Sequence, residues 1–200
     1  MKLPSDHAGL NHPVNNLFLS LIPEGHSGPE VDKLAKQKKV EHHLTGKPLG
    51  LPQYHVSLFS FGTFTDIPSE LVLAISKVFA PLAAGTAPFS VCFDRTRTVD
   101  TRKPKLPFVL HSSVINKSLM EFYRKLSPHG RGSRRTLKPH VTLLYDAKNI
   151  PEHPVNPVGW LVSQLVLVRS YVGLGMHEHV ARWPFLGNPS DAQMDLPFGL

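Results

Sequence analysis

Cysteine is nearly absent from the sequence, and Cys92 is the single one in 200 residues. One cysteine excludes an internal disulfide and a zinc site built from several thiolates. This usage is typical of a reducing compartment, so we expect a cytoplasmic protein. Cys92 lies in the apolar stretch FSVCF, where a small buried hydrophobic side chain is a better interpretation than a catalytic nucleophile.

Long hydrophobic runs are also missing. The longest, LVSQLVLV at 161–168, is interrupted by serine and glutamine and is too short to span a bilayer. The N-terminal stretch MKLPSDHAGLNHPVNN contains no apolar segment of the length that signal peptides require. We therefore expect no association with a membrane.

Several motifs that define enzyme classes are lacking. The sequence has no Walker glycine-rich loop, no G-x-S-x-G, no H-E-x-x-H and no Rossmann glycine pattern, which argues against the enzyme classes that these motifs define. Acidic residues are the minority charge, since 15 Asp and Glu against 22 Lys and Arg give a net charge of +7. That balance suits an anionic partner such as a phosphate ester or RNA, although proteins without such a partner share it.

Alternating strand-like and helix-like segments cover most of the chain. The apolar periodicity predicts helices over 29–44, 67–82 and 113–126, and strands over 16–22, 53–62, 88–93, 106–111, 140–146, 160–170 and 177–185. Residues 1–15 are expected to form a flexible arm, residues 16–186 a single domain, and residues 187–200 an irregular tail. The fold class is therefore α+β.

The third predicted helix and the basic stretch before it carry more specific expectations. Ser113 is available as the N-cap of that helix, and Val114 and Ile115 are expected to face inward. In the basic stretch DRTRTVDTRKPK, arginine alternates with threonine. That alternation suggests that Arg95 and Arg97 are surface charges on an exposed strand face.

One short pattern occurs twice. Residues 55–58 read HVSL and residues 140–143 read HVTL, 85 positions apart. Chance gives roughly 0.2 matches to H-x-[ST]-L in a chain of this composition. Two matches that also share valine and a strand context therefore favour a functional origin.

The two motifs suggest a specific chemistry. Because alternate side chains of a strand share a face, His55 and Ser57 point the same way, and so do His140 and Thr142, while the apolar residues of each motif enter the core. One neutral imidazole can act as general base while a second, protonated imidazole acts as general acid. The hydroxyls can donate hydrogen bonds to phosphate oxygens. Two such strands lining one cleft could cleave a phosphodiester without a metal.

The two motifs resemble the paired H-x-[ST]-Φ signatures (Φ hydrophobic) of the two-histidine phosphoesterases. The chain is similar in particular to the bacterial RNA 2′,3′-cyclic phosphodiesterases, also called 2′-5′ RNA ligases. The likeness covers roughly residues 16–185 and includes LFLSLIPEG, KPHVTL, LVLVRS and HEHVARWPF. It implies a bilobal, pseudo-twofold α+β structure with antiparallel sheets around a central cleft.

The resemblance also implies roles for the motif residues. His55 would donate a proton to the leaving ribose oxygen, and His140 would be the base that activates water. Ser57 and Thr142 would hold the phosphate, and the product would be a 2′-phosphate. The expected partner is RNA or a nucleotide that ends in a 2′,3′-cyclic phosphate. We expect a monomer that needs no cofactor and no metal.

The chain departs from the family after each motif. Many members carry arginine there, whereas this sequence has Phe59-Ser60 and Leu144-Tyr145. Phe59 is best interpreted as a core residue, and Tyr145 could stack on a base. Arg135, in a basic loop just before the second motif, could bind an anionic substrate or could simply be solvated.

Two alternatives stay open at this point. A non-catalytic protein could bind nucleotides or RNA in the same cleft, which the missing arginines would favour. A histidine-rich metal-binding protein is the other. His42 and His43, as neighbours on a helix, point about 100° apart and chelate poorly; His177 and His179 could share a strand face, but no further ligand is evident. We therefore expect no metal site.

Overall fold

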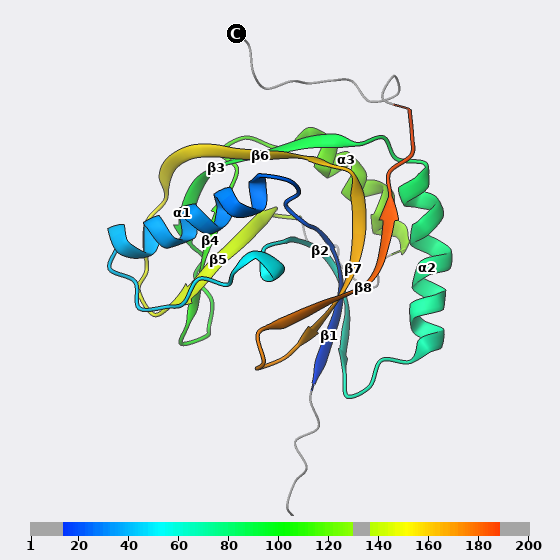
Figure 1. The fold of residues 1–200 in the computed structure, drawn as a ribbon, viewed down its shortest axis with the longest axis horizontal. Helices are drawn as coiled ribbons and strands as arrows, with labels where there is room; N and C mark the ends of the chain where they lie inside the picture. The colour runs from blue at the N-terminus through cyan, green and yellow to red at the C-terminus, as the bar shows by residue number, and fades with distance from the viewer. Residues whose placement is uncertain (1–13, 130–136, 189–200) are drawn as a thin grey trace, which may run out of the picture.

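A computed structural model of the chain describes residues 14–129 and 137–188. Within these residues eight strands form one antiparallel sheet, in the order β6-β3-β4-β5-β2-β1-β7-β8, and three helices pack on it (Figure 1). None of these helices is long and apolar enough to cross a membrane.

The elements alternate along the chain much as expected. The helices are α1 (Ser27–Glu41), α2 (Ser69–Ala84) and α3 (Lys117–Leu126). The strands are β1 (Asn15–Leu21), β2 (Val56–Phe64), β3 (Phe89–Thr98), β4 (Leu106–His111), β5 (His140–Asp146), β6 (His153–Val162), β7 (Gln164–Tyr171) and β8 (Met176–Pro184). Single turns of 3₁₀-helix at Leu51–Gln53 and Ser127–His129 precede the two motifs along the chain.

The sheet has two four-stranded halves, β2-β1-β7-β8 and β5-β4-β3-β6. They meet at β2 and β5, which share the single residue pair Val56–Val141. These two valines are the second residues of the two motifs, so a local twofold relation centred on this pair places HVSL opposite HVTL. The predicted α+β class and the pseudo-twofold arrangement of two halves are confirmed. Both halves belong to one continuous sheet.

The apolar residues of both motifs point into the core, as the predicted alternation of side chains along each strand requires. Val56, Val141 and Leu143 have no exposed surface, and Leu58 is 7% exposed. Helix α1 packs against β5 and β6, α2 packs against β8, and α3 packs against β3 (Figure 1). The apolar residues of both motifs therefore lie in one core shared by the two halves, which leaves the polar residues on the other side of their strands.

The predicted strand over 160–170 is wrong in its bounds. Two strands meet there at Ser163, whose hydroxyl donates a 2.6 Å hydrogen bond to Glu24. The first of them, β6, reaches back to His153 and includes Pro154 and Pro157. Prolines argue against a strand in sequence, but β6 is an edge strand, and an edge strand tolerates residues that donate no ladder hydrogen bond.

The predicted start of the third helix is also wrong. Helix α3 begins at Lys117 with Asn116 at its N-cap position, and Ser113 donates instead to the carboxylate of Asp94. Val114 and Ile115, expected inside, are 73% and 77% exposed. The cause is a tertiary contact: the side-chain amide of Asn116 pairs with the backbone N–H and C=O of Cys92 in β3, which holds the preceding segment away from a helix.

Candidate active site

His55 and His140 are held in the same way at the starts of their strands. The backbone carbonyl two residues earlier lies 2.7 Å from Nδ1 of His55, at Gln53, and 2.8 Å from Nδ1 of His140, at Lys138. A carbonyl only accepts hydrogen bonds, so Nδ1 of each ring donates. In its neutral form, each imidazole then has its free lone pair on Nε2. The two histidines, related by the pseudo-twofold symmetry, therefore have the same tautomer, with the proton on Nδ1.

The polar residues of both motifs line one cavity of about 460 Å³. Its walls are formed by Asn16, Leu49, Gln53, His55, Ser57, His140, Thr142, Tyr145, Ser170, Tyr171, Val172, Gly173, Gly175 and His177. Antiparallel pairing about Val56–Val141 sets Ser57 across from His140 and Thr142 across from His55. Two imidazoles and two hydroxyls therefore share one small volume at the centre of the sheet.

Ser57 already contacts its histidine. Its hydroxyl oxygen lies 3.0 Å from Nε2 of His55. Because Nδ1 of the neutral ring carries the proton, the Ser57 hydroxyl is the donor in this bond. The same hydroxyl can donate to a phosphate oxygen when Nε2 becomes protonated and no longer accepts.

His177 of β8 is a third imidazole in this cavity, which the sequence did not predict. Its ring centroid lies 5.2 Å from that of His55 and 5.8 Å from that of Phe18, and Phe18 also packs on His55 at 4.9 Å. The sequence showed His177 only as part of the H-E-H stretch. The signal that it faces His55 lies in the pairing of β7 with both β1 and β8, which is a property of the sheet.

Burial shapes the acid–base behaviour of His55. Removal from water lowers its pKa to about 4; the hydrogen bond to Gln53 opposes the shift, and positive charge on His177 or His140 adds to it. At neutral pH the His55 imidazole is therefore uncharged in the empty cavity. A role as proton donor requires a ligand that raises this pKa, as an anion next to Nε2 does.

We expect phosphate to bind together with a proton. The pKa of His55, about 4 in the free protein, should rise by at least one unit when inorganic phosphate occupies the cavity, because the anion favours the charged imidazole. Phosphate affinity should accordingly increase as the pH falls through the raised pKa of the complex towards the free-protein value of about 4. Histidine C–H resonances followed by NMR through a pH titration, with and without phosphate, measure both effects. An unchanged His55 titration at saturating phosphate would place the anion elsewhere.

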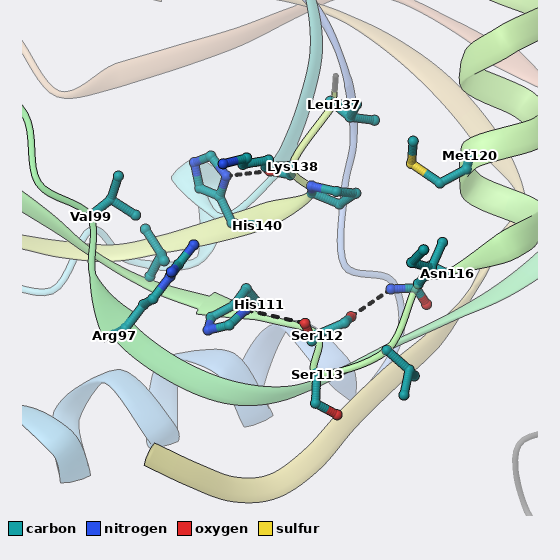
Figure 2. Close-up of a pocket in the computed structure, with 14 residues that line it drawn as sticks. Arg97, Val99, His111, Ser112, Ser113, Asn116, Met120, Leu137, Lys138 and His140 are labelled. Atoms are coloured by element: carbon teal, nitrogen blue, oxygen red, sulfur yellow. Dashed lines mark hydrogen bonds between the residues drawn. The ribbon is translucent and has the colours of Figure 1, made fainter. Parts of the chain in front are cut away.

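His140 also lines a second cavity, of about 490 Å³. Figure 2 shows Arg97, His111 and His140 turned toward one space, with Met120 entering from α3. Aliphatic residues, namely Val99, Val109, Val114, Ile115 and Leu137, form much of the remaining wall. This cavity is therefore apolar with cationic groups, whereas the described residues that line the motif cavity include no lysine or arginine.

Arg97 lies in the wall of this second cavity, although its alternation with threonine suggested surface charge. The residue is half-buried, and its Nε atom has no hydrogen-bond partner among the described residues. Next to it, burial and the charge of Arg97 lower the pKa of His111. Arg97 is thus a cation available to an anionic ligand beside His140.

The structure places the other predicted residues as follows. Phe59 is buried and stacks on Tyr123 at 4.8 Å, which confirms its interpretation as a core residue. Tyr145 lines the motif cavity and is 44% exposed. Arg135 lies outside the described residues. Cys92 is half-buried, and burial together with Asp94 raises the pKa of its thiol, which agrees with the expectation that it is no nucleophile.

Comparisons with known proteins identify the fold. No protein-family model and no curated protein sequence matches the chain. TT0787 of Thermus thermophilus superimposes with a TM-score of 0.62 at 19% identity, over 86% of this chain and 98% of that chain. E. coli LigT with bound 3′-AMP gives 0.62 at 18% identity, and its apo form 0.62 at 22%, each over the same shares. The chain has the LigT-like two-histidine phosphoesterase fold.

Proposed function

We propose that this protein is a metal-independent phosphodiesterase that opens 2′,3′-cyclic phosphates at the ends of RNA or oligonucleotides and leaves a 2′-phosphate. The observation that carries the proposal is the pair His55 and His140 in one cavity, each with Nδ1 anchored to a backbone carbonyl and each facing a hydroxyl, Ser57 or Thr142. The fold shared with LigT supports it, as do LigT structures solved with 3′-AMP, ATP and NADP+.

The geometry suggests the following sequence of proton transfers. Nε2 of His140 takes a proton from a water molecule as its oxygen attacks phosphorus. The bond from phosphorus to the ribose 3′ oxygen breaks, and this oxygen takes the proton that Nε2 of His55 acquired when the anionic substrate bound. Ser57 and Thr142 donate hydrogen bonds to the nonbridging oxygens, where negative charge develops. After the reaction His140 is protonated and His55 is neutral. Transfer of one proton from His140 to His55 through solvent restores the starting state.

The second cavity supports an oligonucleotide as the substrate. Lys138 and Arg97 line it beside His140, and these cations can bind the phosphate of a neighbouring nucleotide. Its aliphatic wall can contact a ribose or a base of any identity, because it offers no hydrogen-bonding groups that would distinguish one base from another. The same arrangement, with the 5′-hydroxyl of a second strand in place of water as the nucleophile, would form a 2′-5′ bond as the 3′ oxygen leaves, so weak ligase activity accompanies the proposal.

Hydrolysis of a cyclic-phosphate-ended oligonucleotide in excess EDTA tests the proposal directly. We expect a 2′-phosphate product, identified by its resistance to an enzyme that releases only 3′-phosphates, and a rate that added Mg²⁺ or Zn²⁺ does not increase. Activity that disappears in EDTA and returns with a metal, while circular dichroism shows the protein folded throughout, would contradict the mechanism. A 3′-phosphate product would show that the scissile bond is the other one.

A second candidate is a non-catalytic nucleotide-binding protein that uses the same cavity. Among the described residues no lysine or arginine lines the motif cavity, and Phe59, where the family that the motifs resemble often has arginine, is buried against Tyr123. The assay above separates the two functions. A binding protein would bind the oligonucleotide saturably and would release no product, even after prolonged incubation.

A further inference from the structure

We propose that Glu41, His42 and His153 form a structural binding site for a divalent cation of the Zn²⁺ type, separate from the cleft. One ligand atom from each of the three residues lies within 4.8 Å of the others, and in the described part of the chain they are the only such group. His42 follows α1 directly, and His153 begins β6. Neither motif contains any of these residues.

The distances fit a tetrahedral ion. The Nε2 atoms of His42 and His153 lie 3.1 Å apart, and two nitrogen ligands at ~2.0–2.1 Å from a tetrahedral zinc ion lie ~3.3 Å apart. The Oε1 atom of Glu41 is 3.7 Å from Nε2 of His42. The hydroxyl oxygen of Thr96 lies 2.8 Å from Nε2 of His153 and marks the direction from which a fourth oxygen ligand can approach.

The proton positions favour a cation over a simple hydrogen bond. Nδ1 of His153 lies 3.0 Å from the carbonyl of Pro151 and must donate to it, so Nε2 of the neutral ring keeps one lone pair. Two groups, the His42 imidazole and the Thr96 hydroxyl, approach this one lone pair. An ion between the two rings accepts a lone pair from each. A ligating histidine whose other nitrogen donates to a carbonyl is the usual arrangement in metal sites.

The carboxylate of Glu41 is already oriented. Both of its oxygens lie 2.8 Å from Nζ of Lys38, which is buried. One oxygen can stay on Lys38 while the other turns to the ion, because a ligating carboxylate is commonly held by a hydrogen bond from outside the site. The negative end of the α1 dipole, at the helix C-terminus, also favours a cation here.

The location indicates a role in stability. Thr96 alternates in β3 with Arg95 and Arg97, so its side chain points to the opposite face of the sheet from the second cavity. An ion there would join the end of α1 to the start of β6, on the face that α1 covers. A ligand that binds the folded state alone stabilises it, without contact with the reacting phosphate.

Zinc titration of tag-free, metal-depleted protein tests the site, with Co²⁺ as a spectroscopic probe. We expect one tight site per chain, visible absorption typical of tetrahedral Co²⁺, and a higher Tm with Zn²⁺. The variants His42→Gln and His153→Gln should each weaken binding by at least 100-fold and abolish the Tm increase. His43→Gln is the matched control, because His43 is adjacent and exposed.

Other results would overturn the proposal. No binding at 100 µM Zn²⁺ would leave the pair as a hydrogen bond between two histidines. Tight binding that survives in His42→Gln but is lost in His177→Gln would place the ion in the motif cavity. His42 is partly exposed, so His42→Gln keeps the test available even where His153→Gln does not fold.

Discussion

Replacing His140 with alanine is expected to lower kcat/KM for a 2′,3′-cyclic phosphate substrate by ~10²- to 10⁴-fold, the range seen when a general acid or base is removed. His55→Ala should have an effect of the same size. In each ring the hydrogen bond from Nδ1 to a backbone carbonyl directs Nε2 into the cavity, and alanine has neither group. Steady-state hydrolysis by each variant, in EDTA, measures the loss.

The double variant gives a sharper result than either single one. Acid and base act on one transition state, so removal of both should cost about as much as removal of one, far less than the product of the two losses. His26→Ala is the matched control, because His26 is exposed and lies outside both cavities. Full activity of His55→Ala and His140→Ala, with both folded, would rule out the two-histidine mechanism.

Replacing Asp146 with alanine is expected to lower the free energy of unfolding by about 3 kcal/mol, the upper end for hydrogen bonds to a charged group. Asp146 ends β5 and is buried. Its carboxylate accepts bonds from the N–H groups of Thr45, Gly46 and Lys148 at 2.7–2.9 Å, and from the Thr45 hydroxyl at 3.1 Å. Without it these four donor groups lose their common acceptor. Urea denaturation measures the change, and the exposed Asp66→Ala should stay within about 0.5 kcal/mol of wild type.

Gly46 shows how closely this loop is held. A Cβ at this position would lie 2.1 Å from the carbonyl oxygen of Tyr145, so the loop after α1 can approach β5 only with glycine there. Asp146→Ala should therefore also loosen the end of the second motif strand. An unchanged midpoint and slope in urea would show that backbone contacts alone hold the loop.

The pH dependence of stability provides a second measure of the same carboxylate. Burial alone would raise the pKa of Asp146, but the hydrogen bonds from Lys148, Gly46 and Thr45 outweigh it and hold the pKa at about 2, below the ordinary 3.8. A depressed folded-state pKa contributes stability above the unfolded pKa, and this contribution is lost as the pH falls from about 4 to 2. It amounts to about 2 kcal/mol. Asp146→Ala should lack that step.

The fold class and the motif histidines could be predicted because their signals are local. A period of two over a few residues decides which side chains of HVSL and HVTL enter the core, and the structure follows it. The hydrogen bonds that orient His55 and His140 reach back only two residues in the chain. These features depend on the segment itself, whichever strand lies beside it.

The features that the sequence did not predict correctly depend on contacts between distant segments. The part of β6 before Trp160 was missed because its prolines are acceptable only at a sheet edge, and the sequence of a segment does not reveal whether it lies at an edge. The start of α3 moved because Asn116 pairs with Cys92, 24 residues away. Arg97 was expected on the surface, yet α3 and the chain around His140 close a cavity over it.

The sequence alone determined the two motif histidines, their hydroxyl neighbours and the strand face that they share. Which further side chains join them was decided by tertiary structure: His177 reaches His55 through the register of β7 and β8, and His42 meets His153 across 111 residues. The physical reason is that a strand's side-chain direction follows from its own backbone, whereas its neighbours follow from the order of strands in the sheet, which the whole chain determines by burying one common core.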